Sequence, residues 1–197
     1  MEEGKAKLNA KGQTLEQFLA SYDPAKYRHP AVTADCVIFA GDRVLLVRRG
    51  NHPFIGDLAF PGGFCEAGES TEQSAARELM EETGAKIQKY RQFYTASTPG
   101  RDPRDWTVSV CYMAELPADI VVRGADDAAS ADFYAYTVSG TDTELTLTLD
   151  GGDCGSTTVL RVARDAYGKV DVNNTEVLIR GMAFDHAQIL LRAIEER

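Results

Sequence analysis

Three glutamates, Glu78, Glu81 and Glu82, stand at positions i, i+3 and i+4 in a segment of strong helix formers. At about 100° per residue, this spacing places the three carboxylates on one stripe of a helix. Like charges at this spacing cost an isolated helix roughly 0.2–0.5 kcal/mol per pair, and the helix dipole disfavours them in its second half. A hard divalent cation with oxygen ligands would offset this cost. The alternative is a solvated acidic stripe.

Two neighbouring features favour the cation. The residues after a capping box at Ser70 and Gln73 predict a helix over 71–83 that ends at the C-cap glycine Gly84, with an apolar face that packs on a sheet. The turn Pro61-Gly62-Gly63 lies just upstream, and glycine lets the backbone approach a ligand closely. We therefore expect the acidic stripe to face this turn.

The elements that must position this stripe form an α/β pattern. Runs of β-branched residues at 31–39 and 43–47 flank Ala40-Gly41-Asp42 and predict a β-hairpin. Further strands are predicted at about 87–97, 107–115, 120–122 and 132–138. Together they predict one mixed, central sheet.

The ends of the chain differ from this central part. Residues 1–29 are predicted to form an N-terminal arm with one short helix that begins at a capping box of Thr14 and Gln17. Residues 30–197 are predicted to form the main domain. Within it, alternating residues over about 139–181, including a strand at 170–172, predict inserted β-hairpins, and helical spacing predicts an amphipathic helix over about 183–196.

Composition narrows the classes of function. The 197 residues carry a formal charge of −9, which disfavours non-specific binding of nucleic acid but allows one phosphorylated ligand in a local site. The four cysteines form no C-x-x-C pair, and so neither a zinc site nor a disulfide framework is indicated. No secretory signal or membrane span is evident, and we expect a cytoplasmic protein without a membrane partner.

The acidic helix and the glycine turn resemble a known family. The residues Gly63, Glu69, Arg77-Glu78-Leu79, Glu81-Glu82 and Gly84 reproduce the G-x5-E-x7-R-E-U-x-E-E-x-G-U signature of the Nudix hydrolases. The final position departs from it, because Ala85 stands where a bulky aliphatic residue is usual, and Ile87 is the candidate for that packing role. The resemblance implies an α/β/α sandwich around a mixed β-sheet. It also implies hydrolysis of a nucleoside diphosphate linked to another moiety, with Mg²⁺ or Mn²⁺ as cofactor.

The same resemblance assigns roles to the matching residues. It implies that Glu78, Glu81 and Glu82 hold the metal, and that the backbone of Gly63 or of its neighbour Gly62 completes the coordination. It also implies that Arg77 and Glu69 orient the helix and the loop before it. A bound cation would neutralise the diphosphate and lower the pKa of an attacking water.

A wider similarity points to the ADP-ribose pyrophosphatase branch. It rests on the run 48–61, the loop 99–104 and Phe184-Asp-His-Ala187; in that branch a proline about fifteen residues past the signature, here Pro99, is associated with ADP-ribose. Relatives also carry an acidic residue that acts as a base where Asp126 and Asp127 stand, and Asp127 is our candidate.

Other residues can be interpreted either as ligand-binding residues or as ordinary structural residues. Arg101 and Arg104 suit phosphate or ribose oxygens, or belong to a solvated turn. Phe54 and Trp106 suit stacking on a base, or belong to the core. His186 is interpreted as a structural residue of the last helix.

The leading hypothesis is hydrolysis of ADP-ribose to AMP and ribose 5-phosphate. One alternative is a Nudix-type hydrolase of nucleoside triphosphates, and another is a non-catalytic ADP-ribose-type ligand sensor. Sensors of this branch carry a DNA-binding winged helix, and we expect none here, because the chain ends about ten residues after Ala187. The expected partner is a small nucleoside diphosphate substrate, with a homodimer left open.

Overall fold

The computed structural model describes residues 7–117, 120, 122, 128–151 and 155–197. In these residues ten strands form one sheet, ordered β10-β9-β8-β7-β2-β1-β6-β5, with β3 beside β2 and β4 beside β1. The pair β1 and β6 is parallel and the others are antiparallel, so the predicted mixed sheet is confirmed. The strands are β1 (Ala31–Ala40), β2 (Arg43–Arg49), β3 (Leu58–Ala59), β4 (Gly62–Phe64), β5 (Arg91–Ala96), β6 (Thr107–Glu115), β7 (Ala128–Gly140), β8 (Glu144–Asp150), β9 (Ser156–Arg161) and β10 (Glu176–Ile179).

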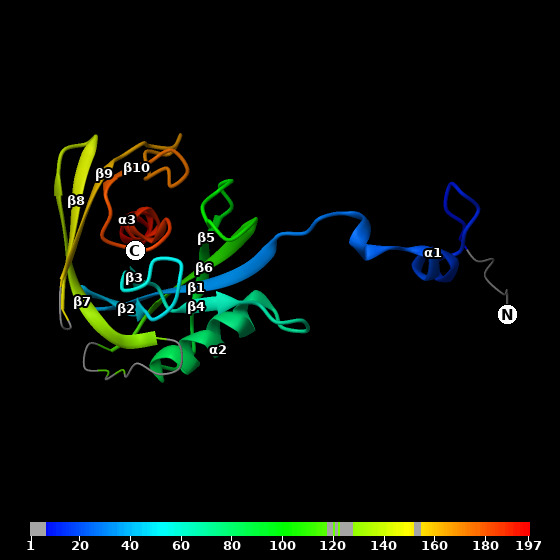
Figure 1. Cartoon of the computed structure of the whole chain (residues 1–197), viewed down its shortest axis with the longest axis horizontal. Helices are drawn as coiled ribbons and strands as arrows, with labels where there is room; N and C mark the ends of the chain where they lie inside the picture. Colours follow the sequence, from blue (N-terminus) through cyan, green and yellow to red (C-terminus); the bar gives the residue numbers. More distant parts are fainter. Residues whose placement is uncertain (1–6, 118–119, 121, 123–127, 152–154) are drawn as a thin grey trace.

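One helix covers each face of this sheet. Alternate residues of β1 point to opposite faces. Cys36 and Ile38 pack in the apolar cluster that contains Leu79 of α2 (Thr71–Thr83), whereas Val37 packs in the cluster of α3 (His186–Glu196). Figure 1 shows the sheet between the two helices. The predicted α/β/α sandwich is therefore confirmed.

The acidic helix α2 has the predicted bounds because its ends are specified locally. The Ser70 hydroxyl accepts a hydrogen bond from the Gln73 N–H, and the Gln73 side chain accepts one from the Ser70 N–H. Gly84 ends the helix in a left-handed conformation at φ 68°, which glycine adopts without a Cβ penalty. Ala85 is buried on this face, and Ile87 packs against the same cluster.

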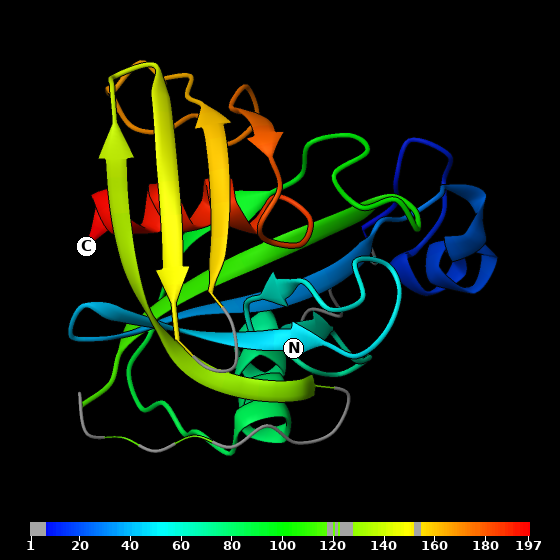
Figure 2. The same ribbon diagram turned by 60° about the vertical axis from the view of Figure 1, so that its left-hand side comes forward.

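The strands after β7 continue the main sheet. Strands β8, β9 and β10 follow β7 by antiparallel pairing, and Figures 1 and 2 show them curving around α3. Leu147, Leu149 and Leu160 point inward and share one core cluster with Ile189 and Leu190. The segment 139–181 thus supplies much of the surface on which α3 packs.

Some predicted boundaries are wrong. The strand expected at 170–172 is only an isolated bridge between Val170 and Arg164. The last helix begins at His186 and not at 183, because Phe184 has a positive φ of 50° that a helix does not accept. Strand β5 begins at Arg91, four residues after the expected start. The strand expected at 120–122 lies partly outside the described residues.

The N-terminal arm extends away from the sheet (Figure 1). The capping box at Thr14 forms, and α1 (Leu15–Ser21) is followed by a short 3₁₀ helix, η1 (Pro24–Lys26). Neither contributes a buried residue, and an ion pair between Arg28 and Asp105 joins the end of the arm to the main domain. Within the described part of the chain, no helix has the length and apolar character needed to cross a membrane.

The separation of β1 and β2 creates the place for a site. These strands pair only where Phe39 faces Val44 and Ala40 faces Arg43. Beyond this point β3 pairs with β2, and β4 pairs with residues 33–35 of β1. The chain that crosses between the two strands carries the glycine turn, and β4 contacts α2.

Candidate active site

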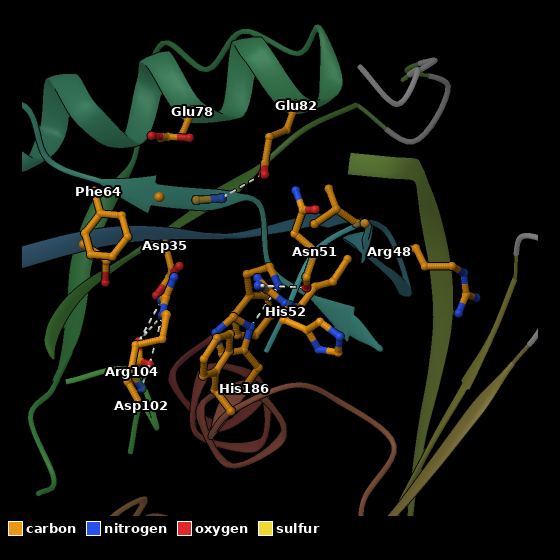
Figure 3. A pocket seen from close by; sticks show the side chains of 18 of the residues that line it. Asp35, Arg48, Asn51, His52, Phe64, Glu78, Glu82, Asp102, Arg104 and His186 are labelled. Carbon is orange, nitrogen blue, oxygen red and sulfur yellow. Dashed lines mark hydrogen bonds and ion pairs between the residues drawn. The ribbon is translucent and has the colours of Figure 1, made fainter. Parts of the chain in front are cut away.

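A pocket of about 490 Å³ lies beside this turn (Figure 3). Its lining combines α2, β1, β4, the segment after β2, the loop before β6 and the start of α3. It brings together seven of the residues expected from the sequence, namely Gly62, Gly63, Arg77, Glu78, Glu82, Arg101 and Arg104. Glu69, Glu81, Phe54 and Pro99 are not among the described residues that line it.

The two glycines of the turn make room for two carboxylates. A Cβ atom on Gly63 would lie 2.5 Å from Cδ of Glu78, closer than real Cβ atoms approach. A Cβ atom on Gly62, whose φ is 155°, would lie 2.6 Å from Oδ1 of Asp35. At Gly62 a Cβ atom would also lie 2.4 Å from the Ala34 carbonyl oxygen, so glycine is required there, whereas at Gly63 a Cβ atom would displace the Glu78 side chain.

Glu82 is held against the turn by the backbone. Its Oε2 atom accepts a hydrogen bond of 3.0 Å from the Gly62 N–H. Burial raises the pKa of Glu82 to about 7, and the nearby charges of Glu78 and Asp35 act in the same direction. Burial also raises the pKa of Glu78. A bound cation would favour the charged form of both carboxylates.

Arg77 connects four oxygen acceptors around the helix. Its guanidinium donates to Glu69 at 3.0 Å, to Glu78 at 2.8 Å, to Glu81 at 3.0 Å and to the carbonyl of Phe64 at 3.0 Å. The side chain of Glu69 also accepts from the Ser74 hydroxyl. Hydrogen bonds from Arg77 lower the pKa of Glu69. These contacts are those that an orienting role for Arg77 and Glu69 requires.

The three glutamates do not point at one common position. Glu78 and Glu81 bond to Arg77, Glu82 bonds to Gly62, and the side chain of Glu81 is 45% exposed. Among the described residues, no group of three or more His, Cys, Asp or Glu side chains is gathered as a metal site. The donor set nevertheless fits a hard divalent cation, because Glu78 and Glu82 offer carboxylate oxygens beside a backbone that lacks Cβ atoms.

The two arginines of the loop before β6 have different surroundings. Arg101 is nearly buried and donates to Asp185 from Nε at 2.8 Å and from Nη2 at 2.6 Å. The solvated alternative is therefore wrong for Arg101. Arg104 forms a two-point contact with Asp102 and is 40% exposed. Its guanidinium carbon lies 4.9 Å from the ring centre of Phe64.

Phe54, Pro99 and Trp106 are not among the described residues that line the pocket. Phe54 packs against the small apolar cluster of Val47, Ala59 and Ala183, with its ring 4.9 Å from that of Phe184. Pro99 and Trp106 are exposed. Asp126 and Asp127 lie outside the described residues.

Several lining residues were not expected from the sequence: Asp35, Arg49, Phe64, Phe184 and His186. The lone carboxylate in the apolar strand TADCVIFA was a signal for Asp35. His186 and Phe184 reach the pocket through strand pairing and helix packing distant in sequence, which local patterns do not reveal.

Two curated proteins are similar to this chain in sequence. The chain is 38% identical over 124 residues to the protein named "ADP-ribose pyrophosphatase" of Methanocaldococcus jannaschii, which covers 60% of this chain and 72% of that protein. It is 36% identical over 105 residues to the "ADPR responsive transcriptional repressor NtrR" of Acinetobacter baylyi, covering 50% of this chain but only 42% of the repressor.

Solved structures agree over most of the chain. A MutT/nudix family protein from Enterococcus faecalis superposes with a TM-score of 0.73 and 31% identity, covering 93% of this chain and 69% of that one. The NUDIX domain of Shewanella oneidensis NrtR, solved with ADP ribose, gives a TM-score of 0.66 and 27% identity, covering 93% of this chain and 99% of that one. Residues 29–138 match the family described as NUDIX domain. The chain belongs to the NUDIX family.

Proposed function

We propose that this protein hydrolyses the pyrophosphate bond of ADP-ribose, giving AMP and ribose 5-phosphate. The observation that carries the proposal is the packing of the Glu78 carboxylate against Gly63, with Glu82 bonded to Gly62 in the same pocket. The similarity to an ADP-ribose pyrophosphatase and to a domain solved with ADP ribose supports this substrate.

We assign the pocket residues different roles in this reaction. Glu78, Glu82 and a backbone carbonyl of Gly62 or Gly63 would hold Mg²⁺ or Mn²⁺, which when bound neutralises the diphosphate and makes a water more acidic. Glu81, which is not among the described residues that line the pocket, joins them only if its side chain turns toward Glu78 and Glu82. Arg104 lies in the pocket lining with a partly exposed guanidinium, suited to phosphate oxygens. Asp127 remains our candidate for the base.

Hydrolysis is tested with a substrate panel. Purified protein is incubated with Mg²⁺ or Mn²⁺ and with ADP-ribose, other nucleotide sugars, dinucleotides and nucleoside triphosphates, and the products are separated by chromatography. We expect equal amounts of AMP and ribose 5-phosphate, with ADP-ribose giving the highest kcat/KM. A preference for triphosphates would replace this substrate with the alternative one, and no turnover of any compound would rule out the hydrolase.

A ligand sensor is the second candidate, since the matches include the repressor NtrR and the NrtR domain with ADP ribose. Binding of ADP-ribose without turnover in either metal would favour it.

A further inference from the structure

Two buried side chains in the pocket each have one polar atom bonded within the protein. Asp35 and His186 are only 7% and 4% exposed, and both line the pocket. Oδ2 of Asp35 accepts a hydrogen bond from the Ser109 hydroxyl. Nδ1 of His186 accepts one of 2.9 Å from the Phe60 N–H. The remaining polar atoms, Oδ1 of Asp35 and Nε2 of His186, bond to no group in the described part of the chain.

These two atoms open onto the pocket. Among the described residues, the fully enclosed side-chain nitrogen and oxygen atoms without a partner are Thr158 Oγ1 and Gln188 Oε1. Asp35 Oδ1 and His186 Nε2 are not in this set. Both residues line the pocket, and we infer that these two atoms face it.

The surroundings fix the proton on His186. Because Nδ1 accepts from a backbone N–H, the neutral ring carries its proton on Nε2, which is then a donor. The ring also stacks on Phe60, with centroids 4.8 Å apart and planes 16° apart, which holds its direction. Burial lowers the pKa of His186 and keeps the ring neutral. A metal at Nε2 would force a proton onto Nδ1, against the Phe60 N–H, and so His186 does not suit metal binding.

Asp35 lies on the α3 face of the sheet, because it alternates with Cys36 on β1. Figure 3 shows it on the same side as His186, away from Glu78 and Glu82. The pocket lining therefore contains an acceptor on Asp35 and a donor on His186, both on the α3 side of β1.

This pair selects one kind of ligand group. Phosphate oxygens only accept hydrogen bonds, and so they offer no donor to the Oδ1 atom of Asp35. A hydroxyl group donates and accepts, and two neighbouring hydroxyls can serve both atoms at once. We propose that Asp35 and His186 form a subsite for the hydroxyls of a sugar, in which Asp35 Oδ1 accepts from one hydroxyl and His186 Nε2 donates to its neighbour. This subsite rests on the proposed function, because it names the part of the substrate that the same pocket recognises.

Calorimetric binding in EDTA, where no turnover occurs, tests the subsite. The ligands are ADP-ribose, the methyl ester of ADP at its terminal phosphate, which lacks the second sugar, and ADP-ribose without the 2′ and 3′ hydroxyls of its adenosine. The variants are H186N, whose amide oxygen can still accept from Phe60, H186F, which keeps the stacked ring, and D35A. The matched control is H29N, because His29 bonds to the Pro24 carbonyl in the arm. Thermal unfolding verifies that each variant is folded.

We expect Kd for ADP-ribose to rise about tenfold in H186N, H186F and D35A and to stay unchanged in H29N, which matches the loss of about one hydrogen bond. Each of the two truncated ligands lacks the hydroxyls of one sugar. The ligand that lacks the hydroxyls recognised by Asp35 and His186 should have the same Kd for the wild type and for these three variants. Equal losses for all three ligands, no loss, or no binding of ADP-ribose by the wild type would each overturn the subsite. If the selective loss is found but wild-type protein with Mg²⁺ or Mn²⁺ does not cleave ADP-ribose, the hydrolase function fails and the subsite stands.

Discussion

The carboxylate of Glu78 occupies the space in which a Cβ atom on residue 63 would have to lie, and only the hydrogen of Gly63 permits this approach. The contact joins the middle of β4 to the middle of α2. It also explains why two features separated along the sequence belong to one site.

The substitution G63A should therefore displace Glu78. We expect kcat/KM to fall at least about a hundredfold, which corresponds to roughly 2.7 kcal/mol of transition-state stabilisation. The control is G68A, because a Cβ atom on Gly68 meets nothing within 4 Å although its φ is 95°. That variant should lose stability through backbone strain but keep its metal affinity. Comparable kinetics for G63A and wild type would contradict the proposed site.

The three glutamates should contribute unequally. Glu78 and Glu82 line the pocket, whereas Glu81 is largely solvent-facing and bonds to Arg77. We expect E78Q and E82Q to lower kcat by about a thousandfold and E81Q by less than about tenfold. Initial rates with saturating Mg²⁺, together with calorimetric Mg²⁺ titrations, measure these effects. An E81Q defect as large as that of E82Q would show that Glu81 turns inward when the metal binds.

Arg77 should act through the carboxylates that it orients. The substitution R77K keeps the charge but not the forked donors, and we expect metal affinity to fall about 10- to 100-fold, as for other outer-shell partners. The matched control is R161K, whose ion pair with Glu176 is exposed on both sides. If R77K binds Mg²⁺ like the wild type, Arg77 does not orient the ligands.

The raised pKa of Glu82 makes the metal-free protein sensitive to pH. Because the folded pKa is about 7 and the unfolded value is near 4.5, the folded state holds this proton more tightly. The free energy of unfolding should therefore fall as pH rises from about 4.5 to 7, by at most about 3 kcal/mol. Urea unfolding in EDTA should show this slope in wild type and a flatter one in E82Q. An identical pH profile for the two proteins would exclude a raised pKa at Glu82.

The buried pair of Arg101 and Asp185 should matter for stability. Removing one partner leaves an unpaired buried charge, and we expect D185N to cost about 3–5 kcal/mol in the free energy of unfolding. The double variant R101M/D185L should recover most of this loss. The KM of the double variant for ADP-ribose then shows whether Arg101 stabilises the fold or binds the substrate. An unchanged KM would assign Arg101 to the fold, and a raised KM would assign it to substrate binding.

Sequence reasoning succeeded where information is local. The bounds of α2 follow from Ser70, Gln73 and Gly84, which lie in the helix or directly beside it, and the signature from Gly63 to Gly84 is one continuous stretch. Sequence reasoning was less successful where the secondary structure depends on pairing between strands that are distant in the sequence. The alternating segment Val170-Asp171-Val172 resembles a strand, but among the described residues its bridge partner is Arg164 alone.

The site shows the same limit. Asp35 and His186 are 151 positions apart in the chain, and only the position of α3 against β1 brings them into one pocket. The residue pattern within either segment does not indicate that the two side chains line the same pocket. The contact between Phe60 and His186, which fixes the ring, is equally non-local.

The continuous sheet has a consequence for how this protein acquires its selectivity. The family match ends at residue 138, yet Leu147, Leu149 and Leu160 beyond it support the helix whose first residue reaches the pocket. A change of side-chain size at any of these leucines would shift that helix and so change the shape of the pocket. The strands that carry them, β8 and β9, supply none of the described residues that line the pocket, and so its shape can be altered from outside its wall.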